Sequence, residues 1–196
     1  MKRIVCSLLL AALAADPALA APLVVTVTDA AGRAVEGAVI TVSVAGGPKA
    51  AAPGATAQMA QQNRQFVPRI LVVQAGTAVS FPNLDTVRHH VYSFSPIKPF
   101  ELKLYAGTPS APIVFDKPGT AVLGCNIHDK MSAWVVVVDT PYFGKTDATG
   151  HAQLDVPEGE HLLRAWHPMQ AEPAVPIERL ARAGSPVALR LTIAPQ

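Results

Sequence analysis

The sequence predicts an all-β protein, and three observations support this prediction. The chain of 196 residues contains 18 prolines and 13 glycines, and only 15% of its residues are charged. That composition favours short strands joined by turns over long helices. Short runs rich in Val, Ile and Thr recur along the chain, separated by turn-forming residues, and none has the periodicity of an amphipathic helix. Seven or more such strands favour β-sandwiches.

The charge balance and cysteine content exclude several classes of protein. Sixteen Lys and Arg residues against 14 Asp and Glu residues give a net charge of +2, spread along the chain. This lacks the basic excess of a nucleic-acid-binding protein, so we expect no nucleic-acid partner. Two cysteines are too few for a disulfide-rich scaffold.

The first 20 residues have the pattern of a signal peptide. A basic start precedes an apolar run over 4–15 that is too short to span a bilayer, and small residues lead up to Ala20. Cleavage after Ala20 would leave Cys125 as the one cysteine of the mature chain. No second apolar stretch is long enough to cross a membrane. We therefore expect a periplasmic protein without a membrane span.

The expected strands fall into three groups along the chain. The first group is 23–28 and 38–44, after which the Ala-, Gly-, Pro- and Gln-rich residues 46–62 read as a linker. The second group is 70–74, 77–81, 91–94, 102–105, 113–115, 121–125 and 134–139. The third group is 161–166 and 187–193, and the last of these alternates between apolar and polar residues.

The first and last groups share a family resemblance. Val25-Thr-Val-Thr-Asp-Ala-Ala-Gly32 resembles the opening of the carboxypeptidase-regulatory-like β-sandwich, and Asp155-Val-Pro-Glu-Gly159 resembles its closing half. The resemblance implies one small, discontinuous β-sandwich built from 21–45 and 141–196. A second domain at 63–140 would interrupt it, since insertion points lie close together on a domain surface.

The strongest chemical motif is Gly124-Cys-Asn-Ile-His-Asp-Lys-Met131, which lies between two apolar strands. It places Cys125, His128 and Met131 at i, i+3 and i+6, where one short loop can turn all three side chains towards one point. A thiolate, an imidazole and a weak thioether suit a copper ion in both oxidation states. Zinc gains little from a thioether. A second imidazole is needed, and His89 and His90 both offer one upstream.

Residues 63–140 resemble a cupredoxin of the plastocyanin and amicyanin type. Phe66-Val-Pro-Arg-Ile70 lies in a stretch similar to the family's opening, and Phe115-Asp-Lys-Pro-Gly119 begins a stretch similar to its closing. The short Cys-x2-His-x2-Met spacing is that of amicyanin-type members, and the segment also resembles proteins labelled methylamine-utilization proteins. The resemblance implies a Greek-key β-sandwich that holds one type 1 copper ion.

Carried over to this chain, the resemblance implies specific ligands. Cys125 would supply the thiolate, His128 the loop imidazole and Met131 the weak axial thioether. The upstream family motif His-Asn-Val aligns with His89-His90-Val91, which makes His89 the preferred ligand. His90 stands where the family has Asn, so it is the less favoured ligand or a neighbour that bonds to the ligands.

These ligands imply an exported blue copper protein that carries one electron at a time and is not an enzyme. The redox partner would be a protein, with a cytochrome or an amine dehydrogenase suggested by the resemblance, and we expect the carrier to be a monomer. Two other hypotheses stay open at this point: periplasmic copper storage or delivery, and a binding module without redox function.

Overall fold

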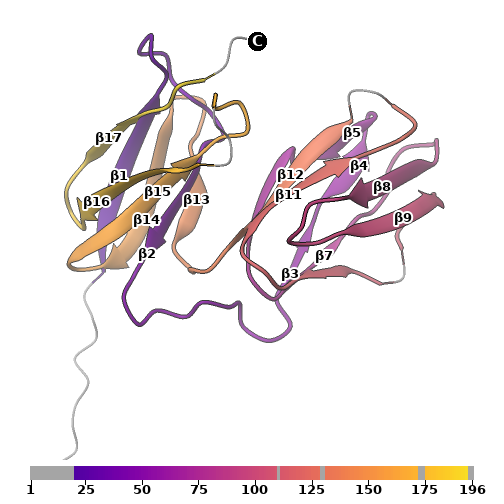
Figure 1. Ribbon diagram of the computed structural model, residues 1–196, viewed down its shortest axis with the longest axis horizontal. Coiled ribbons are helices and arrows are strands. Elements are labelled where there is room, and N and C mark those ends of the chain that lie inside the picture. Colours follow the sequence, from indigo (N-terminus) through magenta and orange to yellow (C-terminus); the bar gives the residue numbers. More distant parts are fainter. Residues whose placement is uncertain (1–19, 110, 129–130, 172–174, 194–196) are drawn as a thin grey trace, which may run out of the picture.

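The computed structural model describes residues 20–109, 111–128, 131–171 and 175–193. All its regular elements are strands, and no helix occurs in these ranges, which confirms the predicted all-β class. Two β-structures lie side by side, and residues 44–55 run beneath them in the view of Figure 1 from one to the other. No helix in the described ranges is long and apolar enough to cross a membrane.

The first β-structure, here called the terminal sandwich, is built from both ends of the chain. One sheet has the order β14-β1-β17, and the other has the order β13-β2-β15-β16. β1 pairs antiparallel with β14 and parallel with β17, so the N-terminal strand lies between two C-terminal ones. The bounds are β1 (Ala20–Thr28), β2 (Val39–Ser43), β13 (Phe143–Lys145), β14 (His151–Pro157), β15 (Glu160–Trp166), β16 (Ile177–Arg182) and β17 (Val187–Arg190).

The second β-structure, here called the central sandwich, has a five-stranded sheet of order β6-β12-β11-β8-β9. A three-stranded sheet of order β10-β7-β3 and the hairpin β4–β5 complete it. β12 pairs parallel with β6 and antiparallel with β11, so the sheet is mixed. The bounds are β3 (Thr56–Gln58), β4 (Ala60–Gln62), β5 (Gln65–Val67), β6 (Ile70–Gln74), β7 (Thr77–Ser80), β8 (His89–Ser93), β9 (Phe100–Tyr105), β10 (Ile113–Phe115), β11 (Gly119–Gly124) and β12 (Ser132–Val138).

Each sandwich has its own apolar core, as strand alternation requires. In the terminal sandwich, alternate residues of β1 such as Leu23, Val25 and Val27 are fully buried. In the central sandwich, Phe81 and Phe115 are the largest fully buried side chains. Cys125 and Met131 belong to this second core.

The prediction of a linker over 46–62 is wrong for its second half. Residues 56–62 form β3 and β4; β3 pairs parallel with β7, and β4 pairs with β5. Met59 and Gln61 are fully buried. The segment lacks an apolar pattern because its buried residues, 59–61, are consecutive rather than alternating and include a glutamine. Its order comes from backbone hydrogen bonds to the neighbouring strands.

Two other predictions concern where β1 and β8 begin. The predicted signal peptide lies outside the described residues except for Ala20, which begins β1 and pairs with Pro157. The strand predicted to start at 91 starts at His89, so both upstream histidines are strand residues. Consecutive strand residues point to opposite faces, and His89 and His90 therefore cannot face the same site.

The two sandwiches meet through a third apolar cluster. Val39 and Trp166 of the terminal sandwich pack with Val136 and Val138 of β12. A hydrogen bond of 2.9 Å from Lys145 Nζ to the carbonyl of Ile70 also crosses the junction. One part of the outer face of the five-stranded sheet is thus covered by the terminal sandwich.

Candidate metal centre

His89 begins β8 on the inner face of the five-stranded sheet and is fully buried. Its Nε2 lies 2.8 Å from Oδ2 of Asp85. An ionised carboxylate can only accept hydrogen bonds, so Nε2 donates and carries the ring proton. Nδ1 is then left with its lone pair, and it faces the sulfur of Cys125 at 3.9 Å. The ring is therefore held in the tautomer that a metal ligand needs.

Cys125 follows directly after β11, and its side chain turns into the core. It is 7% exposed and free of any disulfide. The chain then turns, and the N–H of Met131 donates to the carbonyl of His128 at 3.0 Å before β12 begins. This connection between two paired strands places Cys125 and His128 at the same end of the sheet, as the motif spacing predicts.

His128 completes the group from the loop between β11 and β12. The ring is half-buried, and its Nδ1 is buried without a hydrogen-bond partner among the described residues. Leaving a buried nitrogen unpaired costs about 1–3 kcal/mol. A ligand that binds this atom would remove the cost.

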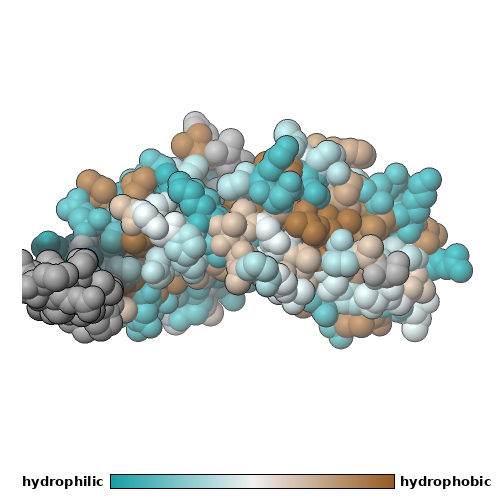
Figure 2. All heavy atoms as spheres, turned by 90° about the horizontal axis from the view of Figure 1, so that it is seen from below, coloured by the Kyte–Doolittle hydropathy of each residue, from teal (hydrophilic) through white to brown (hydrophobic). Residues whose placement is uncertain are grey.

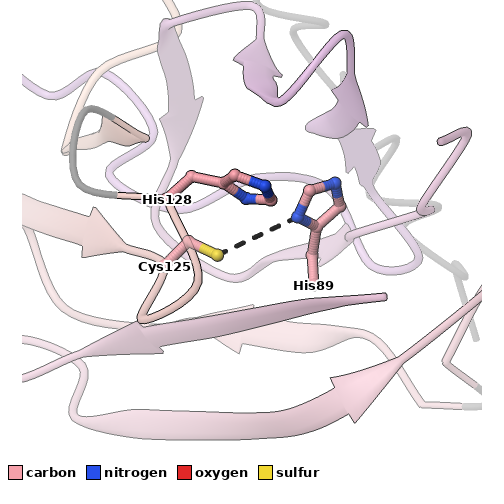
Figure 3. A group of neighbouring side chains, drawn as sticks. All are labelled: His89, Cys125 and His128. Carbon is pink, nitrogen blue, oxygen red and sulfur yellow. Dashed lines mark hydrogen bonds between the residues drawn. The ribbon is translucent and has the colours of Figure 1, made fainter. Parts of the chain in front are cut away.

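The three side chains converge on one point (Figure 3). One ligand atom from each of His89, Cys125 and His128 lies within 4.8 Å of the others, and no second group of this kind occurs in the described parts of the chain. The two imidazole rings are 5.1 Å apart between centroids and inclined by 59°. Two imidazole nitrogens and one thiolate sulfur are donors that copper accepts well. The residues present therefore fit a copper ion.

Asp85 anchors this arrangement, and the sequence analysis did not single it out. Its carboxylate accepts the N–H of Asn63 at 2.7 Å and the N–H of Arg64 at 2.9 Å, in addition to His89. Burial favours a higher pKa for Asp85, but the backbone bond from Arg64, the bond from His89 and the backbone bond from Asn63 outweigh it, so the pKa lies below the ordinary value of 3.8. Asp85 is therefore a charged acceptor at neutral pH.

The two backbone donors come from an unusual turn. Asn63 and Arg64 have φ values of 54° and 58°, the left-handed conformation of a two-residue hairpin turn between β4 and β5. This conformation aims both N–H groups at one carboxylate. The only sequence signal for the contact is that Asp85 stands four residues before His89, and nothing local links it to the hairpin.

His90 lies outside the group of three. Its Nε2 is 2.8 Å from Oε1 of Glu101 on β9, and its ring is 5.4 Å from that of Tyr92. The side chain is on the outer face of the sheet, because it follows an inward-facing residue in the same strand. The geometry therefore favours His89 over His90 as the upstream ligand.

Met131 is 3% exposed and packs in the same apolar cluster as Cys125. Both residues also contribute to the lining of one hollow at the end of the sheet. Its place in the core is compatible with a thioether near the group of three. Asp129 and Lys130, in the same loop, lie outside the described residues.

Among known proteins, similarity to this chain is found only with solved structures. No model of a known protein family matches the chain, and no curated protein matches it. A copper-containing nitrite reductase from Thermus scotoductus is 28% identical over 48% of this chain and 24% of its own, with a TM-score of 0.40. A purple cupredoxin from Nitrosopumilus maritimus is 22% identical over 41% of this chain and 98% of its own, with a TM-score of 0.37. The reduced Cu(I) form of an amicyanin mutant is 21% identical over 50% of this chain and 97% of its own, with a TM-score of 0.38.

The chain thus spans about a quarter of the nitrite reductase but nearly all of each small cupredoxin. Each of these three structures covers half of this chain or less.

Proposed function

We propose that this protein is an exported mononuclear type 1 copper protein that carries one electron at a time. The observation that carries the proposal is the convergence of ligand atoms of His89, Cys125 and His128 within 4.8 Å, with Nδ1 of His128 buried and without a hydrogen-bond partner among the described residues. Met131, buried beside Cys125, would be the weak fourth ligand. Bound there, one copper ion would supply reversible one-electron chemistry.

In this function the protein keeps the ligand atoms in fixed positions. His89 is fixed by a strand and by the bond to Asp85, and Cys125 is fixed by the end of β11. Cys125 packs in the apolar core and His89 is fully buried, so close packing resists movement when the charge of the site changes. Such a site needs little rearrangement between oxidation states.

His128 is the proposed point of electron exit, because it is the least buried of the three. Its loop also presents Ile127, which is 48% exposed. A redox partner would make a small and short-lived contact here, as electron-transfer partners do. A cytochrome or an amine dehydrogenase would suit this role, and a periplasmic location would follow from cleavage of residues 1–20.

The test is an optical spectrum of the purified protein after addition of cupric ion, repeated with Cys125→Ser. We expect an intense visible band from the copper–thiolate bond in the wild type and none in the variant, with reversible reduction. A wild-type protein that binds copper without such a band, or a variant that keeps the band, would overturn the proposal. Preferential binding of cuprous ion with rapid transfer to a chelator would favour storage or delivery.

A further inference from the structure

A cavity of about 410 Å³ lies at the junction of the two sandwiches, away from the three converging ligands. Ligand-binding cavities in proteins occupy roughly 300–1,000 Å³ and favour the interfaces between domains. Both sandwiches contribute walls to this one. The terminal sandwich supplies Val39 and Thr41 of β2 and Arg164 and Trp166 of β15, and the central sandwich supplies Thr120 of β11 and Val136, Val138 and Asp139 at the end of β12.

The inner walls are apolar. Val39, Val136, Val138 and Trp166 are each at most 8% exposed and form the cluster that joins the sandwiches. At roughly 30 Å³ for each water molecule, the cavity has room for about a dozen waters, or for an aromatic ring with a short substituent.

Two opposite charges are among the lining residues, one from each sandwich. Arg164 donates from Nε to Glu178 at 2.6 Å and from Nη1 to Ser43 at 2.8 Å, while its Nη2 bonds to no residue in the described ranges. Asp139, on the central sandwich, has a side chain that is 43% exposed and lies 4.0 Å from Lys49. The cavity therefore offers a guanidinium donor on one side and a carboxylate acceptor on the other.

We propose that this cavity binds a small zwitterion with an aromatic body, of the class of the free aromatic amino acids. The ring would lie against the apolar walls, the carboxylate of the ligand would bind Arg164, and its ammonium group would bind Asp139. Glu178 and Lys49 partly neutralise the two charges, so neither single charge makes a strong site. A ligand that uses both charges gains from each and keeps the cavity neutral, whereas a ligand with one charge leaves the opposite wall unpaired.

The test compares three probes that share one ring. L-Phenylalanine carries both charges, 3-phenylpropionate has only the carboxylate, and phenethylamine has only the amine. Calorimetric titration uses the full-length chain without added copper, because phenylalanine chelates free cupric ion. We expect phenylalanine to bind about ten-fold more tightly than either analogue. Equal affinity for all three, or no saturable binding of phenylalanine, would overturn the proposal.

Four variants locate the binding. Arg164→Met should weaken phenylalanine and 3-phenylpropionate but not phenethylamine, and Asp139→Asn should weaken phenylalanine and phenethylamine but not 3-phenylpropionate. Thr120→Phe should fill the cavity and abolish binding. Val122→Phe is the matched control, since it lies two residues further along the same face of β11 and does not line the cavity.

Each variant is first checked by thermal unfolding, so that lost binding is read only from folded protein. Binding that survives Thr120→Phe, or that is lost equally in Val122→Phe, would refute this location. The optical test of the copper site is independent of this result, because no proposed copper ligand lines the cavity.

Discussion

Asp85→Asn tests whether the copper site depends on a carboxylate beyond its ligands. In the wild type, Oδ2 accepts from both Arg64 N and His89 Nε2, at 2.9 and 2.8 Å, and Oδ1 accepts from Asn63 N at 2.7 Å. An amide replaces one of these oxygens by an NH2 group, so at least one N–H donor faces another donor. Only His89 among these donors is fully buried, and leaving its Nε2 unpaired would cost about 1–3 kcal/mol; the two backbone bonds are exposed.

The amide also permits the wrong tautomer of His89. If the NH2 group faces Nε2, the ring can accept that bond only by moving its proton to Nδ1, the nitrogen that faces Cys125 at 3.9 Å. A protonated Nδ1 cannot bind a metal. Loss of such a supporting bond costs roughly 10–100-fold in metal affinity, or about 1.4–2.7 kcal/mol.

The assay is a competition between the protein and a chromophoric cuprous chelator, with the optical band of the cupric form recorded in parallel. Asp116→Asn is the matched control, since Asp116 is an exposed carboxylate of the same sandwich that bonds Lys98 at 3.3 Å. We expect the control to keep wild-type affinity. Wild-type affinity in Asp85→Asn as well would show that the negative charge of residue 85 is not needed to position the ligand.

Three further predictions concern packing and pH. In Gly124→Ala the new Cβ would lie 2.6 Å from Cζ and Oη of Tyr92, so this ring must shift and we expect a loss of about 1 kcal/mol in the free energy of unfolding; the same change made in a Tyr92→Ala background should cost less, and equal costs in both backgrounds would contradict the close contact. Ile40→Ala removes a fully buried side chain and should cost about 2–5 kcal/mol in denaturant titrations, and a cost below that of an ordinary surface change would contradict its burial. The backbone and side-chain bonds from Arg33 lower the pKa of Asp29 below 3.8, so the stability that this carboxylate contributes is full above that value and falls as the pH drops through the lowered pKa. Asp29→Asn should flatten that acid limb of unfolding curves recorded against pH, and an unchanged slope would count against the argument.

The sequence predicts those features that depend on neighbouring residues. The alternation of apolar residues predicts β17, because each face of that strand meets a different environment, and the continuous apolar run over 135–138 predicts β12 as a strand covered on both faces. The spacing of Cys125, His128 and Met131 predicts a shared site in the same way, since one short loop cannot carry its side chains far apart. The structure brings Cys125 and His128 together as expected.

The sequence does not predict strands that are held in place by pairing with distant segments. β3 and β4 were read as linker because their residues have no apolar pattern, and they are ordered by pairing with β7 and β5. β14 and β16 were likewise missed, and both are held by neighbouring strands of the terminal sandwich. Backbone hydrogen bonds stabilise a strand whatever its side chains, so weak local patterns leave such strands invisible in the sequence.

The choice between His89 and His90 as the upstream ligand separates what the sequence determines from what only the tertiary structure decides. The sequence by itself determines an all-β chain and a copper-compatible Cys–His–Met loop with two adjacent candidate imidazoles, because these features are local. The tertiary structure decides that His89 begins a strand facing inward, and that Asp85 and the turn at Asn63 orient its ring. The bonds from Asn63 and Arg64 to Asp85 join segments more than 20 residues apart, and their geometry depends on how the sheets pack, which no short stretch of sequence specifies.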